Sequence, residues 1–86
     1  MYTAFLGPQA RKFLKKSEKE LYPRIKHKIE ELEKNPFPSE VERVKGSGDQ
    51  KIFRVRVGQY RIKYIVYHEK KEILVFDIDR RETVYN

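Results

Sequence analysis

Basic side chains recur at alternate positions in the second half of the chain, where they could bind and polarise a phosphate group. Arg54 and Arg56 are two residues apart, and Arg61 and Lys63 repeat that spacing. Residues two apart project from the same face of a β-strand. Arginine also presents a planar fork of donors that fits phosphate. A phosphate-binding face is therefore the first functional hypothesis, and an ordinary solvated sheet face is the alternative.

The turn at Gly58-Gln59 predicts which of these cations lie opposite each other on neighbouring strands. Alternating residues flank it on both sides, and Gly stands at the first central position, as in a type II′ hairpin. The resulting register sets Arg56 opposite Arg61. It also sets Arg54 opposite Lys63. Because like charges placed directly opposite destabilise a sheet, this arrangement favours a functional use of the face.

A second hairpin brings the last strand beside this pair. A three-residue loop over residues 69–71 would turn alternate residues of that strand toward the core: Leu74, Phe76 and Ile78. On the other face, Asp79 would then lie beside Arg61, and Asp77 beside Lys63. A slip of one residue would bury both carboxylates, which is costly without partners.

Other candidates for catalysis or metal binding are weak. His27 is expected on an exposed helix surface and His68 at the end of a strand, so the two do not form an acid–base pair. Asp77 and Asp79 share a face and could hold a cation in principle, but the neighbouring arginines disfavour one. We therefore predict no metal site and no cofactor.

Size and charge limit the classes of function. The chain has 86 residues, with 20 Lys and Arg against 13 Asp and Glu, a net charge of +7. This excess favours an anionic partner such as nucleic acid or an acidic protein, with a solvated lysine-rich surface as the alternative. The absence of Cys excludes disulfides and thiolate chemistry. Without an apolar run of about 18–20 residues or a leader pattern, we expect a cytoplasmic protein that binds no membrane.

The period of the apolar pattern divides the chain into helices and strands. Residues 2–6 alternate as a short strand, and Gly7-Pro8 then starts a helix whose apolar stripe runs to Leu21. A second helix ends at Asn35-Pro36, and the two helices are expected to join at residues 21–23. Further strands are predicted over 41–45, 51–57, 60–68 and 73–79. The order β-α-α-β-β-β-β predicts an α+β fold and a single domain, with two antiparallel helices packed on one face of a small, mainly antiparallel sheet.

An apolar patch is predicted on the face of the sheet away from the helices. Its members lie at the end opposite the Gly58-Gln59 turn: Ile52, Ile65, Tyr67, Ile73 and Val75. Exposed clusters of this kind mark interaction sites in monomers. A partner segment with apolar and acidic residues would fit both this patch and the basic face. The alternative is that residues 2–6 or the C-terminal tail cover the patch.

The C-terminal segment places an aromatic ring near arginines. Tyr85 follows Arg80 and Arg81 within a few residues. A tyrosine in this position can stack on a nucleobase. Alternatively, it pins the tail to the sheet.

Three stretches of the sequence resemble the RelE toxins of type II toxin–antitoxin systems. They are Val44-Lys45-Gly46, residues 52–64 with the sequence IFRVRVGQYRIKY, and residues 79–85 with the sequence DRRETVY. Together with the order of elements, the resemblance covers nearly the whole chain. The central stretch is typical of the RelE/ParE superfamily. It does not separate the RNA-cleaving RelE branch from the ParE branch, whose members inhibit DNA gyrase.

The resemblance implies a ribosome-dependent mRNA endonuclease that cleaves mRNA in the ribosomal A site. In this family the 2′-OH attacks its adjacent phosphate without a metal and leaves a 2′,3′-cyclic phosphate. The implied partner is a RelB-like antitoxin, which would form a hetero-oligomer with the toxin and dock on the apolar patch. The alternatives are a ParE-type toxin that catalyses nothing and a non-catalytic basic RNA-binding module.

The resemblance also implies roles for individual residues. The catalytic residues would be Arg61 at the scissile phosphate, Arg81 near the leaving group and Tyr85 on the codon. RNA or phosphate binding is expected of a further basic set: Lys45, Arg54, Arg56, Lys63 and Arg80. Well-known members carry lysine at the two strand positions before the turn that are arginine here. An arginine does not give up its proton near neutral pH, and Lys63 is the nearest lysine on the same face.

Overall fold

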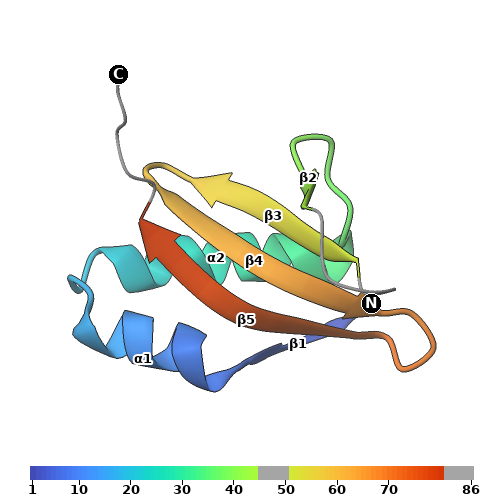
Figure 1. Ribbon diagram of the computed structural model, residues 1–86, viewed down its shortest axis with the longest axis horizontal. Coiled ribbons are helices and arrows are strands. Elements are labelled where there is room, and N and C mark those ends of the chain that lie inside the picture. The colour runs from blue at the N-terminus through green and yellow to red at the C-terminus, as the bar shows by residue number, and fades with distance from the viewer. Residues whose placement is uncertain (45–50, 81–86) are drawn as a thin grey trace.

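The computed structural model describes residues 1–44 and 51–80 and confirms the α+β fold. Its elements follow in the order β1 (Thr3–Leu6), α1 (Pro8–Lys16), α2 (Leu21–Lys34), β2 (Glu42–Val44), β3 (Ile52–Val57), β4 (Tyr60–Tyr67) and β5 (Glu72–Arg80) (Figure 1). The strands form one five-stranded sheet in the order β1-β5-β4-β3-β2. β1 is parallel to β5, and every other pairing is antiparallel.

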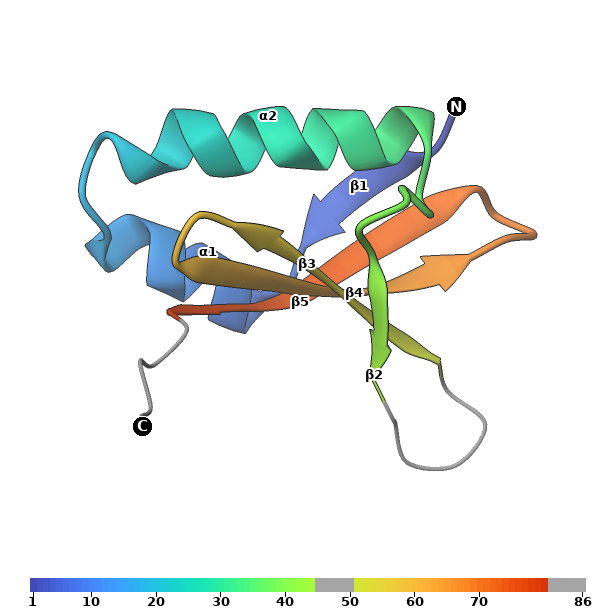
Figure 2. The ribbon, with the colours of Figure 1, turned by 90° about the horizontal axis from the view of Figure 1, so that it is seen from above.

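The helices leave one face of the sheet uncovered. Figure 2 shows α2 lying along one face, and within residues 1–44 and 51–80 no helix covers the other. We call this second side the free face. In the same described residues, no helix is long and apolar enough to cross a membrane.

The break between the helices falls earlier than the apolar stripe predicts. α1 ends at Lys16, where the backbone N–H and the hydroxyl of Ser17 both donate to the Leu14 carbonyl, at 3.2 and 2.8 Å. Leu21 therefore begins α2 instead of ending α1, and the connection is residues 17–20. Leu21 is still buried, at 4% exposure, because the connection returns the chain to the same core. The stripe thus indicates burial correctly and the helix boundary incorrectly.

The core lies between the two helices and the covered face of the sheet. Its buried apolar residues come from both layers: Ala10, Leu21, Ile25, Leu32, Val55, Ile62, Tyr64, Ile73, Val75 and Ile78. The Tyr64 hydroxyl donates a 2.7 Å hydrogen bond to the Pro36 carbonyl, so the polar end of this buried ring has a partner. Burial raises the pKa of Tyr64 well above its usual value. The bond ties the segment after α2 to the centre of the sheet.

The first hairpin has the predicted register. Arg56 pairs with Arg61 across it, and Arg54 pairs with Lys63. Gly58 has a φ of +60°, which the first central residue of a type II′ turn requires. A Cβ at Gly58 would also require the flexible Arg24 guanidinium to move aside. Glycine adopts this φ without strain and other residues do not, so Gly58 specifies the turn that sets the register of the basic face.

The second hairpin matches the prediction on one side of an irregularity and departs from it on the other. Arg61 pairs with Asp79 and Lys63 with Asp77, as expected, but the register then shifts, so that Tyr64 pairs with Val75. Phe76 is the extra residue, and β5 bulges at this point.

The shift corrects the predicted core. The loop over residues 68–71 is one residue longer than expected, and Tyr67 pairs with Glu72. Ile73 and Val75 therefore turn inward and have no exposed surface, whereas Leu74 and Phe76 are only partly buried. The longer loop and the bulge offset each other, so the residues from Asp77 to Asp79 keep their predicted partners.

Candidate phosphate-binding face

The strands bring four of the predicted phosphate-binding cations together on the free face. β3 supplies Arg54 and Arg56, and β4 supplies Arg61 and Lys63. Their register places them on neighbouring strands near the Gly58-Gln59 turn. We call these four residues the basic face.

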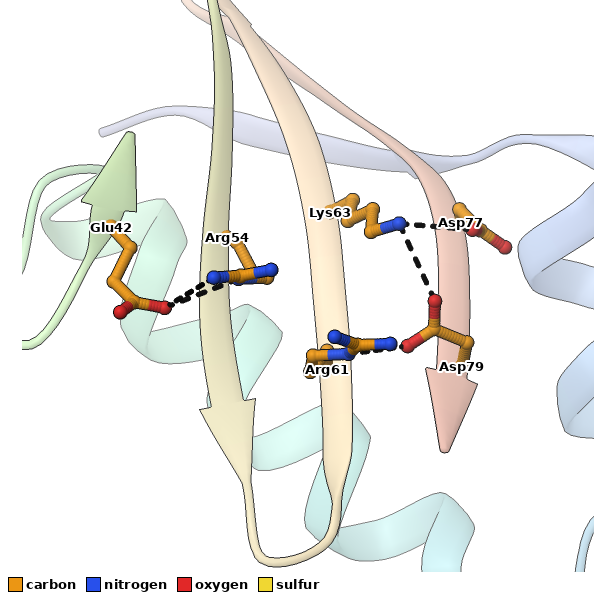
Figure 3. Close-up of polar contacts among 6 residues, drawn as sticks. All are labelled: Glu42, Arg54, Arg61, Lys63, Asp77 and Asp79. Carbon is orange, nitrogen blue, oxygen red and sulfur yellow. Dashed lines mark hydrogen bonds and ion pairs between the residues drawn. The ribbon is translucent and has the colours of Figure 1, made fainter. Parts of the chain in front are cut away.

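A shared carboxylate organises the β4 half of the basic face. Arg61 Nε donates to Asp79 Oδ1 at 2.8 Å, and the other oxygen of Asp79 lies 3.4 Å from Lys63 Nζ (Figure 3). Lys63 Nζ is also 3.9 Å from Asp77 Oδ2. Asp79 therefore fixes the position of both cations relative to each other. Among the described residues this is the only side-chain bond of Arg61, so both terminal nitrogens of its guanidinium remain available to an anion.

The β3 half has a carboxylate that the sequence did not reveal. Glu42 on β2 pairs with Arg54, and its Oε1 accepts hydrogen bonds from Arg54 Nε and Nη2 at 3.1 and 2.9 Å (Figure 3). The sequence did place Glu42 in a predicted strand, because it lies inside the segment 41–45. No short turn links that segment to the next strand, so its partner could not be inferred.

Arg56 has the least compensation within the basic face. It is exposed and directly opposite Arg61, and in the described part of the chain no carboxylate contacts it. The four cations stand against three carboxylates, Glu42, Asp77 and Asp79, so the face is more nearly neutral than predicted. The excess charge is concentrated between Arg56 and Arg61. An anionic phosphate would relieve the repulsion there.

Arg80, which is also predicted to bind phosphate, is not part of the basic face. It pairs with Tyr60, whose ring packs edge-to-face on Phe13 of α1 at a centroid distance of 5.9 Å. Side chains alternate along β5, so Arg80 lies on the helix side of the sheet, next to α1. The three remaining candidates, Lys45, Arg81 and Tyr85, lie outside the described residues.

The apolar patch exists with a different membership. Ile73 and Val75 are in the core, for the reason given above, and do not belong to it. Leu74 takes their place, because it pairs with Ile65 on one side and with Phe5 of β1 on the other.

The register extends this row to the other edge of the sheet. The β3–β4 pairing ends at Phe53 and Tyr64, and one further step in the same register places Ile52 beside Ile65. On its other side, Ile52 pairs with Val44 of β2. One side chain from each strand therefore contributes to what we call the apolar row: Phe5, Leu74, Ile65, Ile52 and Val44. Tyr67, the other predicted member, is 39% exposed and lies two residues beyond Ile65 on β4, toward the loop over residues 68–71. Residues 2–6 do not cover the patch; instead Phe5, half exposed, extends it.

Both histidines lie where they were expected. His27 is exposed on α2 and 3.0 Å from Glu31. His68 directly follows the end of β4 and is stacked on Phe37 with a centroid distance of 5.5 Å. The two do not form a pair, and neither lies on the basic face.

This chain is similar to known proteins in sequence. Residues 2–85 match the family described as the ParE toxin of the type II toxin–antitoxin system. The protein named RelE1 of Methanocaldococcus jannaschii is 38% identical over 65 residues, which span 72% of this chain and 70% of RelE1.

Solved structures are similar in fold. A chain of the archaeal RelE–RelB complex from Pyrococcus horikoshii OT3 matches with a TM-score of 0.82 and 30% identity, over 96% of this chain and 98% of that one. The isolated E. coli RelE toxin matches with a TM-score of 0.77 and 23% identity, over 98% of this chain and 88% of its own.

Proposed function

We propose that this chain, which belongs to the RelE/ParE superfamily of toxins from type II toxin–antitoxin systems, is a ribosome-dependent mRNA endonuclease. It would cleave mRNA in the ribosomal A site and would be held inactive by an antitoxin. The observation that carries the proposal is the pairing of Arg56 and Arg61 on a sheet face that no described helix covers.

Phosphate stabilisation is the chemistry that this geometry supports. The 2′-oxygen of the RNA attacks the adjacent phosphorus, the 5′-oxygen leaves, and negative charge builds up on the phosphate oxygens in between. Arg61 is held by Asp79 through Nε, so its terminal nitrogens can donate to those oxygens without reorientation. Donors positioned in advance in this way stabilise a transition state at little reorganisation cost.

Proton transfer must come from elsewhere on the molecule or from its partners. Arg54 and Arg56 keep their protons near neutral pH, so neither acts as a base. Lys63 lies on the same face but next to two carboxylates. Tyr85 and Arg81 are assigned the roles of base or stacking group and of leaving-group stabiliser by resemblance alone. We infer that the basic face contributes positioning and charge stabilisation more than proton transfer.

The proposed antitoxin contact is the apolar row. Five apolar side chains across one sheet face are unusual on a monomer, and the matched Pyrococcus horikoshii chain belongs to a RelE–RelB complex. The row adjoins the basic face, because Ile52 and Arg54 lie two residues apart on one strand. A partner segment with apolar anchors and acidic flanks would cover both and keep the cations from RNA.

Primer extension on mRNA during induced expression tests the function. Codon-phased cuts that require ribosomes, with a 2′,3′-cyclic phosphate on the upstream product, are the expected result. The control is Arg61→Ala at equal expression. Uncut mRNA in growth-arrested cells would contradict the proposal.

A ParE-type activity is the second candidate, because the matched family is described as a ParE toxin. It predicts gyrase inhibition and DNA damage with intact mRNA. The same cultures distinguish the two candidates when primer extension is combined with an assay of plasmid supercoiling.

A further inference from the structure

Besides the basic face, helix α1 carries a cluster of positive charge that no described carboxylate compensates. α1 carries four exposed cations and no acidic residue: Arg11, Lys12, Lys15 and Lys16. Within residues 1–44 and 51–80, none of the four has an ion pair or a side-chain hydrogen bond. By contrast, Arg54, Arg61 and Lys63 each contact a carboxylate. A cation without a protein partner is free to bind an external anion.

Two of these cations line a groove beside the sheet. The groove has a volume of about 500 Å³ and lies between α1 and the ends of β4 and β5. Lys12 and Lys16 are one helical turn apart and both line it, whereas Arg11 and Lys15 do not. Arg80 lines the opposite wall, where its Nη2 donates to Gln59 Oε1 at 3.0 Å. Cations therefore flank the groove on two sides.

Aromatic rings complete the groove. Phe13 and Tyr60 line it and pack edge-to-face with their centroids 5.9 Å apart. Aromatic rings inside a basic groove form the usual platform for unpaired bases, because every base can stack on them while the cations bind the backbone. A volume of about 500 Å³ also falls in the range of small-molecule pockets, which suits a nucleotide.

The groove continues around the end of the sheet from the basic face. Tyr60 precedes Arg61 in the chain, and its partner Arg80 follows Asp79, which binds Arg61. Two carboxylates also line the groove, Glu18 and Asp77, and Asp77 lies 3.9 Å from Lys63. They reduce the positive potential at one side of the groove, so the phosphate is expected on the Lys12 and Lys16 side.

We propose that this groove binds one unpaired nucleotide of RNA, with its phosphate on Lys12 and Lys16 and its base against Phe13 and Tyr60. The inference rests on the proposed function in taking RNA as the anion. The nucleotide comes either from the substrate strand next to the cleaved codon or from ribosomal RNA. Both sources present the same phosphate and base.

A matched pair of double variants tests the groove. The groove variant carries Lys12→Gln and Lys16→Gln, and the control carries Arg11→Gln and Lys15→Gln. Each variant loses two exposed charges from the same helix, and only the first changes the groove. Binding is measured by fluorescence anisotropy with 2′-O-methyl single-stranded RNA, which cannot be cleaved, and by sedimentation with ribosomes, over a series of salt concentrations.

The groove variant is expected to lose on the order of tenfold in affinity and about 0.7 in the slope of log K against log salt, the value for one phosphate contact on a single strand. The control should change affinity by less than about threefold, as expected for a general effect of net charge. A loss with the free RNA supports contact with the substrate strand, and a loss with ribosomes alone supports contact with ribosomal RNA. Equal losses in the two variants, or no loss in either assay, would overturn the inference.

Failure of this inference is distinguishable from failure of the proposed function. If the wild-type chain binds RNA through the groove but leaves mRNA uncut, the nuclease proposal falls and the groove stands. If the wild-type chain cuts mRNA and the groove variant binds and cuts equally well, the groove falls and the nuclease stands.

Discussion

The two halves of the free face differ in how their positions are specified. The basic face adjoins a two-residue turn, and alternation together with the Gly58-Gln59 turn specifies its register. The apolar row lies beyond the bulge at Phe76, where the register depends on the loop over residues 68–71 and on one additional residue in β5. An error of one residue moves a side chain through the sheet. The positions of the basic side chains can therefore be predicted from a turn, whereas the membership of the apolar row cannot be predicted without the bulge.

The difference also separates the proposed activities. In the proposed function, Arg61 and Arg56 would serve phosphate chemistry and the apolar row would serve a protein partner, although the two surfaces adjoin on β3. If the separation holds, substitutions in one half should leave the other activity measurable. The largest expected effect tests the register itself.

Val75→Asp and Leu74→Asp distinguish the bulged register from the regular one. Val75 has no exposed surface, so a carboxylate there should cost more than about 4 kcal/mol, a large part of the roughly 4–13 kcal/mol expected for a domain of this size. Leu74 lies in the apolar row, and its substitution should cost less than about 1.5 kcal/mol. Urea unfolding of both variants measures the two values. A reversed order of stability would show that Leu74 faces the core.

Sequence patterns predicted the part of the molecule where local chemistry determines geometry. Alternation and one turn placed Arg54, Arg56, Arg61 and Lys63 correctly. Burial was predicted even where a boundary was wrong, as for Leu21. In each case, the deciding signal lies within a few residues of the feature that it specifies.

Long-range features could not be predicted in the same way. The longer loop compensates for the bulge at Phe76, so Asp77 and Asp79 have the same partners with both features as with neither. Their pairing therefore could not reveal the bulge or the longer loop. Glu42 reaches Arg54 through a strand whose register no tight turn fixes. The side on which Arg80 lies could not be inferred, because the predicted strand ends at Asp79; β5 continues past that residue, and alternation then turns Arg80 toward α1.

Arg61→Ala should have the next largest effect, and that effect should be on catalysis and not on stability. Removal of one positioned donor to a transition state costs about 2–4 kcal/mol, or on the order of 10²–10³ in rate. The side chain is partly exposed on the free face, so the fold should survive. The rate of mRNA cleavage on purified ribosomes measures the loss, with Arg11→Ala as a control for the removal of one exposed charge. Near-wild-type cleavage by the folded variant would show that Arg61 does not contact the phosphate.

Ile65→Asp should affect the other half of the free face. Ile65 is central in the apolar row, between Leu74 and Ile52, and a carboxylate there should weaken antitoxin binding by about 2 kcal/mol, roughly thirtyfold in Kd. Calorimetric titration with the cognate antitoxin gives the value. Tyr22→Asp is the matched control, since Tyr22 is half exposed on α2, outside the row. Equal affinity of the Ile65 variant and the wild type would place the antitoxin elsewhere, and loss of cleavage by the same folded variant would show that the two halves are not separate.

The smallest expected effect concerns Tyr85, which lies outside the described residues. Deletion of Tyr85 and Asn86 removes an aromatic ring, and a stacked base contributes about 1–3 kcal/mol, so cleavage should fall by roughly tenfold while ribosome binding stays within a factor of about three. Tyr85→Phe keeps the stacking surface and removes the hydroxyl. If Tyr85→Phe cleaves like the wild type while the deletion does not, the ring acts by stacking. If both lose activity equally, the hydroxyl takes part in proton transfer. Should the deletion instead lower the free energy of unfolding by the same 1–3 kcal/mol and leave the cleavage rate of the folded fraction unchanged, Tyr85 anchors the tail, and catalysis on the basic face depends on the arginines without it.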